Sequence, residues 1–206
     1  MTLRSVADVV QAITDAAAGN ARTLVGLAGS PGSGKSTLAA DVVAALGPRA
    51  ALLPMDGFHL PQATLRSLGR RERMGAPDTF DVPAFAAMLD ALRNRGTTVR
   101  APGFDREVEE AVPDAIVIGP EHDVVVVEGN YLLLDRDGWE AVAAHFDLTF
   151  FLELEAGVRL ERLIHRHERF GKSPDAARAW ALGPDEANAR VIEATIDRAT
   201  HRIRLD

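Results

Sequence analysis

The feature that most constrains this chain is the octapeptide GSPGSGKS at residues 29–36. It follows an apolar segment at 24–28 that is typical of a buried strand, and a helical pattern begins directly after it, at Thr37. Glycines let such a loop turn its backbone N–H groups inward, and the positive end of the following helix dipole faces the same point. The motif G-x-x-x-x-G-K-[ST] in this strand-and-helix setting predicts a phosphate-binding loop, or P-loop, for a nucleotide. A glycine-rich turn that binds nothing is the alternative, and the complete motif weighs against it.

The residue types of this loop have separate expected tasks. Lys35 can reach the β- and γ-phosphates of ATP, and the Ser36 hydroxyl can ligate Mg²⁺. The chain has only one other lysine, Lys172, because its remaining basic residues are arginines. The expected contacts to the nucleotide are made by Gly29, Ser30, Gly32, Ser33, Gly34, Lys35, Ser36 and Thr37.

Composition narrows the class of protein. The formal net charge of −7 repels polyanions, so we expect a small-molecule substrate and no nucleic-acid partner. The chain has no cysteine, which excludes disulfides and thiolate metal sites and fits a reducing cytoplasm. Residues 1–20 lack the apolar run of a signal peptide, and no window resembles a membrane span. We therefore expect a cytoplasmic protein, with a homodimer as an open possibility.

Short apolar runs alternate with helical patterns along the chain, which is typical of an α/β fold with a mainly parallel sheet. We expect a three-layer α/β/α P-loop domain that spans residues 1–206, with a small helical lid that carries arginines. Its expected parts are an N-terminal helix at 3–18, a core at 23–154, and lid and C-terminal helices at 155–199. Further expectations are a hairpin from 97–100 and 115–118, a polar connection at 171–183, a last helix at 184–199 and an edge strand at 201–205.

Two carboxylates end predicted strands. Asp56 follows the strand at 50–54, and Glu128 ends the β-branched run at 123–128. Ligands of open parallel sheets bind at the carboxyl ends of the strands, so both carboxylates are expected at that edge. Asp56 can act as a general base or as a magnesium ligand, although an aspartate before Gly57 is also a common turn residue. Glu128 can hold Mg²⁺ or its water shell, whereas a strand-terminal carboxylate without a role is the alternative.

Arginines gather in two further segments. Steps of three and four residues place Arg159, Arg162, Arg166 and Arg169 on one face of a helix at 156–170. Such a stripe can clamp a phosphoryl group from a lid, or it can be a solvated face in which Glu155 pairs with Arg159. The aperiodic segment 69–80 carries three more arginines, which can contact a substrate or simply face solvent.

Several motifs occur in an order that resembles one family of kinases. They are GSPGSGKS at 29–36, MDGFHL at 55–60, GAPDTFD at 75–81, PGFDR at 102–106, VEGNYLLL at 127–134 and RLIHRH at 162–167. The set resembles the family of phosphoribulokinase, uridine kinase and bacterial pantothenate kinase. It is most similar to small members described as fructose transport system kinases or as nucleoside and nucleotide kinase-like proteins.

The resemblance implies an ATP- and Mg²⁺-dependent kinase that phosphorylates a hydroxyl of a sugar, nucleoside or related metabolite. It assigns Asp56 as general base, Glu128 as the Walker B carboxylate, and Arg162 and Arg166 to a lid over the ATP phosphates. Pantothenate is less expected, because segment 100–103 lacks the histidine of the pantothenate kinases. Candidate substrate contacts are His59, Arg73, Phe80, Phe104, Arg106 and Tyr131.

The sequence lacks the motifs that mark two other classes of nucleotide-binding protein. A GTPase would need a guanine-reading N-K-x-D motif and an ABC ATPase an L-S-G-G-Q-like signature, and the sequence has neither. A non-catalytic ATP-binding regulator or assembly partner stays open, because a fold does not fix a function. A regulator would tolerate loss of Asp56, whereas a kinase would not.

Overall fold

A six-stranded sheet forms the centre of the computed structural model, which describes residues 1–17, 19 and 22–205. Its strand order is β1-β8-β7-β2-β6-β3, and every neighbouring pair in it is parallel. The strands are β1 (Thr2–Leu3), β2 (Thr23–Gly29), β3 (Ala50–Pro54), β6 (Val124–Gly129), β7 (Leu148–Leu152) and β8 (His201–Ile203). The prediction of a mainly parallel α/β sheet is confirmed.

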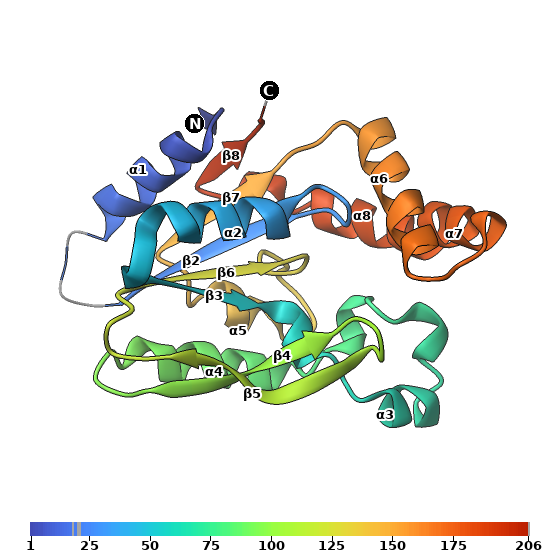
Figure 1. The fold of residues 1–206 in the computed structure, drawn as a ribbon, viewed down its shortest axis with the longest axis horizontal. Coiled ribbons are helices and arrows are strands. Elements are labelled where there is room, and N and C mark those ends of the chain that lie inside the picture. The colour runs from blue at the N-terminus through green and yellow to red at the C-terminus, as the bar shows by residue number, and fades with distance from the viewer. Residues whose placement is uncertain (18, 20–21, 206) are drawn as a thin grey trace.

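Helices cover both faces of this sheet, as Figure 1 shows. Helices α1 (Val6–Ala16) and α2 (Lys35–Leu46) pack on one face, where alternate residues of β2 and β6 such as Val25 and Val126 are buried. Helices α4 (Val82–Arg93) and α5 (Trp139–Ala143) cover the other face. Because both faces are covered, the central strands β2 and β6 are buried along their whole length, which explains the apolar segment at 24–28 and the valine run at 124–127.

An antiparallel hairpin, β4 (Val99–Asp105) with β5 (Glu110–Ile118), lies beside the sheet. It confirms the hairpin expected from 97–100 and 115–118. The hairpin backbone approaches Gly57 so closely that an added Cβ would lie 2.2 Å from the Pro102 carbonyl oxygen. Only glycine allows this approach, which brings the hairpin turn to the carboxyl end of β3.

The remaining helices lie beyond the carboxyl ends of the strands (Figure 1). They are α3 (Gln62–Ser67), α6 (Ala156–Arg169), α7 (Pro174–Trp180) and α8 (Glu186–Glu193). A π-helical turn at Ala181–Asp185 joins α7 to α8. Within the part of the chain that the structure describes, no helix is long and apolar enough to cross a bilayer.

The N-terminal segment differs from its prediction. The helix expected at 3–18 begins at Val6, because Ser5 and Asp8 form a capping box in which each side chain binds the other's backbone N–H group. Leu3 instead belongs to β1, which pairs with β8. Residue 18, the expected end of the helix, lies outside the described residues. Because β1 covers β8, the predicted edge strand at 201–205 is an inner strand and ends at Ile203.

The C-terminal third holds one more helix than expected. The segment predicted as a polar connection, 171–183, contains α7, which begins with a cap from the Ser173 side chain to the Ala176 N–H group and has Pro174 at its first position. The last helix is also shorter than 184–199, because α8 ends at Glu193. These short helices form one wall of the candidate site.

Candidate active site

The phosphate-binding loop connects β2 to α2 and rests on α6. Gly32 and Gly34 have φ values of 80° and 93°, in the left-handed region that favours glycine. A Cβ added to Gly32 would lie 2.8 Å from the Arg159 carbonyl oxygen and 2.7 Å from the Leu163 side chain. The loop conformation and its contact with α6 both therefore depend on glycine. The side chain of Arg162, which is also on α6, lies 3.4 Å from a Cβ built on Gly34.

Glu128 and Ser36 meet at the start of α2. Glu128 is the last residue but one of β6, is 4% exposed and accepts a hydrogen bond of 3.0 Å from the Ser36 hydroxyl. Burial raises the pKa of the Glu128 carboxyl, while the nearby ammonium group of Lys35 counteracts this shift. Burial likewise lowers the pKa of Lys35, and Glu128 and Asp56 oppose that change. A carboxylate, a hydroxyl and an ammonium group thus lie together beside the phosphate-binding loop.

The Ser36–Glu128 pair fits Mg²⁺ by the chemistry of its donors. Magnesium prefers hard oxygen ligands and usually keeps several waters, with further oxygens supplied by substrate phosphates. One hydroxyl and one carboxylate beside a phosphate-binding loop provide that kind of partial coordination. The described residues contain no group of three or more His, Asp or Glu side chains that could hold a metal without such help.

Asp56 lies in a 3₁₀ turn, Met55–Phe58, directly after β3. Its carboxylate accepts a bond of 2.8 Å from the Arg106 guanidinium, which the hairpin turn supplies. Its backbone carbonyl accepts a bond of 2.9 Å from Nδ1 of His59. A carbonyl can only accept, so Nδ1 carries the proton. The prediction that Asp56 lies at the carboxyl edge, near the phosphate-binding loop, agrees with this geometry.

His59 is packed between two aromatic rings. Its ring centroid lies 4.0 Å from that of Phe80 and 4.9 Å from that of Phe104. Burial lowers the pKa of His59, and the nearby carboxylate of Asp56 only partly offsets that effect. These three aromatic side chains form an apolar wall next to Asp56.

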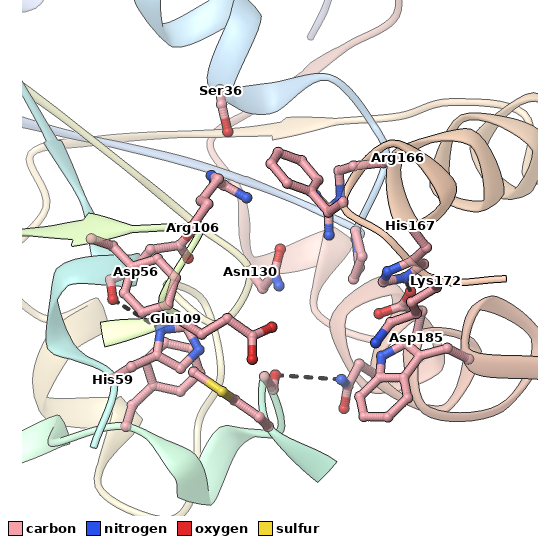
Figure 2. A pocket seen from close by; sticks show the side chains of 18 of the residues that line it. Ser36, Asp56, His59, Arg106, Glu109, Asn130, Arg166, His167, Lys172 and Asp185 are labelled. Atoms are coloured by element: carbon pink, nitrogen blue, oxygen red, sulfur yellow. Dashed lines mark hydrogen bonds and ion pairs between the residues drawn. The ribbon is translucent and has the colours of Figure 1, made fainter. Parts of the chain in front are cut away.

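A cavity of about 490 Å³ unites these groups (Figure 2). It lies between the phosphate-binding loop, the hairpin turn and the helices α6 to α8. Nine of the residues singled out from the sequence line it, namely Lys35, Ser36, Asp56, His59, Phe80, Phe104, Arg106, Glu128 and Arg166. This convergence of residues from distant segments is the main geometric support for a common site.

Other predicted site residues lie outside the cavity wall. Arg73 pairs with Asp78 within its own loop, and the neighbouring Arg71 faces the cavity and pairs with Glu109. Tyr131 is 1% exposed, and its hydroxyl donates to the Gly75 carbonyl at 2.6 Å. Tyr131 is therefore a buried residue that holds the loop at 69–80 through this hydrogen bond.

The arginines of α6 have different surroundings. Arg166 faces the cavity, whereas Arg159 is 2% exposed and donates to the Glu186 carboxylate of α8 at 2.5 Å. The predicted alternative, a Glu155–Arg159 pair, is not formed, because Glu155 accepts from the Val158 N–H group and caps α6. The predicted row of arginines on α6 therefore has more than one role: Arg159 is buried and holds α8, whereas Arg166 faces the cavity.

Sequence reasoning missed most of the cavity wall formed by α6 to α8. His167, the last residue of the RLIHRH motif, faces the cavity and lies 2.7 Å from Asp185 through Nε2. Asn188 donates to the Gly75 carbonyl at 3.3 Å and so connects α8 to the loop at 69–80. Two features of the sequence point to this wall. Asp185 and Asn188 are polar residues three positions apart, a spacing that puts them on one helix face, and Lys172 is the second lysine of the chain. The missed lining residues include Asn130, His167, Lys172, Trp180, Asp185 and Asn188.

Comparison with known proteins assigns the family. Residues 24–200 match the model of the phosphoribulokinase / uridine kinase family. The chain belongs to this family. The match extends from β2 to the segment before β8, so it includes the phosphate-binding loop, the hairpin and the helices of the cavity wall. The family confirms the resemblance inferred from the motifs and implies the use of ATP.

Individual relatives carry the names of several kinases. A Schizosaccharomyces pombe protein provisionally named a uridine kinase is 35% identical, over 71% of this chain and 66% of its own length. A Rhodopseudomonas palustris pantothenate kinase is 31% identical, over 69% of this chain but only 48% of its own length. The chain therefore spans about two thirds and about half of these two relatives.

A solved structure supports the fold over the whole chain. The crystal structure of a protein from Silicibacter sp. TM1040, provisionally named a fructose transport system kinase, superimposes with a TM-score of 0.89 at 40% identity. The alignment covers 96% of this chain and 98% of that one. The α/β architecture is thus shared over nearly the whole of both chains.

Proposed function

We propose that this protein is an ATP-dependent kinase that transfers the γ-phosphoryl group of ATP to a hydroxyl of a small metabolite. The observation that carries the proposal is the placement of Asp56, Lys35 and Arg166 on the wall of one cavity, beside the Ser36–Glu128 pair. These groups provide a base, phosphate ligands and donors for a metal, which together are the requirements of phosphoryl transfer.

In the proposed reaction, the acceptor hydroxyl binds next to Asp56 and its oxygen forms a bond to the γ-phosphorus. The bond between that phosphorus and the β,γ-bridging oxygen breaks, and ADP leaves. The proton of the hydroxyl passes to the Asp56 carboxylate, which Arg106 orients. Lys35 and the loop N–H groups stabilise the charge on the phosphate oxygens. Mg²⁺, held by Ser36 and Glu128 with Asp56 nearby, would supply further neutralisation of this charge.

The helices α6 and α7 supply the proposed lid. Arg166 faces the cavity and Arg162 lies beside Gly34, so both can reach the phosphates from the same side. A lid that closes over the phosphates would also exclude water, which otherwise competes with the acceptor hydroxyl. We place Arg162 and Arg166 in the transfer step on this basis.

The proposed acceptors are sugars, nucleosides and related metabolites. A cavity of about 490 Å³ that must also receive phosphates leaves room for a small acceptor only. A pantothenate kinase activity is the alternative, favoured by relatives of that name and disfavoured by the absence of histidine at 100–103. A cytoplasmic setting and a homodimer stay predictions from the sequence.

The decisive experiment measures ADP formation by the purified protein with ATP, Mg²⁺ and a panel of sugars, nucleosides and pantothenate. We expect one class of acceptor to be phosphorylated and Asp56→Asn to lower kcat by roughly 100-fold or more, with ATP binding unchanged. Asp114→Asn, an exposed aspartate of the hairpin, is the matched control. Equal turnover by Asp56→Asn and the wild type would contradict the assigned role. ATP binding without turnover on any acceptor would favour the non-catalytic regulator.

A further inference from the structure

The cations on the two sides of the cavity wall differ in how they are paired. On the side of β3 and the hairpin, the cations pair with carboxylates, Arg106 with Asp56 and Arg71 with Glu109. On the side of the helices α6 to α8, Nε2 of His167 lies 2.7 Å from the Asp185 carboxylate, and Arg166 is the cation proposed above for the phosphates. Lys172 lines the same cavity, and no ion pair to it is found among the described residues.

Lys172 is held in place by an aromatic ring. Its ammonium nitrogen lies 4.5 Å from the ring centroid of Trp180, the last residue of α7. Cation–π contact of this kind fixes the position of an ammonium group without neutralising its charge. The ring centroid of His167 lies 6.4 Å from that of Trp180, so Lys172, Trp180 and His167 form one cluster. The arrangement leaves a positioned positive charge that faces the cavity.

This cluster lies opposite the proposed base. Figure 2 shows Asp56, His59 and Arg106 on one side of the cavity and His167, Lys172 and Asp185 on the other, with Asn130 between them. The side of Lys172 is also tied to the acceptor side, because Asn188 donates to the Gly75 carbonyl of the loop at 69–80. A compound whose hydroxyl lies at Asp56 would therefore extend across the cavity towards Lys172.

We infer that the acceptor carries an anionic group, a carboxylate or a phosphate, which Lys172 binds at the end of the cavity remote from Asp56. The inference rests on the proposed kinase function and narrows it to hydroxy acids or sugar phosphates. A neutral polyol or nucleoside would offer no counterion to the half-buried ammonium group of Lys172, whereas an anionic group would gain a charge-assisted hydrogen bond there. The anionic group only binds and takes no part in the bond changes at the transferred phosphorus.

The test uses pairs of compounds that differ in one anionic group. The pairs are glycerate and glycerol, pantothenate and pantothenol, and ribose 5-phosphate and ribose, so that carboxylate and phosphate form separate arms. ADP formation is measured for each compound, and its binding to the ADP-loaded full-length protein is measured by calorimetry. The variants are Lys172→Met, Lys172→Arg, and Arg178→Met as a matched control, because Arg178 is an exposed cation of α7 outside the cavity wall.

We expect the anionic member of at least one pair to be preferred. Lys172→Met should raise the KM and Kd for that compound by roughly 10- to 100-fold, the usual effect of losing a charge-assisted contact. The KM for ATP should change less than about twofold, Lys172→Arg should keep most of the affinity, and Arg178→Met should match the wild type. The KM for the neutral member should not respond to Lys172→Met.

Three results would overturn the inference. They are a preference for the neutral members, failure of every anionic compound to bind in calorimetry, and a rise in the KM or Kd of the nucleotide alone, which would assign Lys172 and Trp180 to ATP. Failure of the kinase proposal has a different signature. In that case an anionic compound binds in a Lys172-dependent manner, yet no compound is phosphorylated.

Discussion

At the scale of single residues, Arg106 is the side chain that holds the Asp56 carboxylate. It reaches Asp56 from the hairpin turn, 50 positions along the chain, and donates at 2.8 Å. Arg106→Met should therefore lower kcat by roughly 10- to 100-fold, because a base that is no longer oriented transfers protons less efficiently. Steady-state ADP formation measures the effect. Arg73→Met is the matched control, since Arg73 pairs with Asp78 away from the cavity wall. A folded Arg106→Met protein with unchanged kcat would contradict the orienting role.

His59 makes a second prediction, about the pH dependence of stability. Burial lowers the pKa of His59 in the folded protein below its ordinary value near 6.5. As the pH falls below about 6.5, the unfolded chain binds the proton first, so the free energy of unfolding decreases. The loss continues until the lowered folded pKa is reached, with a slope of at most about 1.4 kcal/mol per pH unit.

The histidine prediction is tested by urea denaturation between about pH 7.5 and 5, where exposed carboxylates are largely ionised and any titration of the buried Glu128 is common to the wild type and the variants. We expect His59→Gln to lose less stability than the wild type over this range. His165→Gln should behave as the wild type, because the His165 side chain is 72% exposed. If His59→Gln and the wild type show the same pH dependence, the assigned burial effect is wrong.

At the scale of elements, the contact between the hairpin and the turn after β3 depends on Gly57. A methyl group there would lie 2.2 Å from the Pro102 carbonyl oxygen, which belongs to backbone that cannot move alone. Gly57→Ala should therefore lower the free energy of unfolding by about 1–3 kcal/mol and raise the KM for the acceptor, since the hairpin carries Arg106. Urea denaturation and kinetics measure the two effects.

Gly96→Ala is the control for that substitution. The nearest atom to a Cβ built on Gly96 is the Asn94 side-chain oxygen at 3.4 Å, an ordinary contact. This variant should stay within about 0.5 kcal/mol of the wild type. Equal stabilities of the two glycine variants would show that the hairpin adapts freely and does not fix the position of Arg106.

The elements that sequence predicts well are those whose signal is local. Strands β2 and β6 are continuous apolar runs because both of their faces are buried, and Glu128 is placed by ending such a run. Helix α7 lacks a comparable signal, since it is only seven residues long and just one of its residues, Ala177, is buried. Lys172 and Trp180 reach the cavity only through the packing of these short helices, and no spacing along the chain encodes that packing.

At the scale of the whole molecule, the cavity lies between two groups of elements that differ in burial. Strands β2 and β6 are buried along their whole length, whereas α6 and α7 present many exposed residues. Helix α8 makes direct hydrogen bonds to two loops at the carboxyl ends of the strands. Glu193 accepts from the Ser30 hydroxyl of the phosphate-binding loop at 3.1 Å, and Asn188 donates to the Gly75 carbonyl. The helices α6 to α8 should therefore open locally at a lower free energy than the sheet.

Hydrogen–deuterium exchange tests this division. Amides of β2 and β6 should exchange slowest, and those of α6 and α7 much faster. A non-hydrolysable ATP analogue with Mg²⁺ should slow exchange in the phosphate-binding loop and also in α6 and α7, because Arg166 and the Gly32 contact would join α6 to the bound phosphates and α7 packs against α6. At 100 times Kd, binding can stabilise the ligand-competent state by about 2.7 kcal/mol, or roughly 100-fold in exchange rate. Slowing confined to the loop would mean that α6 and α7 do not respond to the nucleotide, and the lid assigned to them would be wrong.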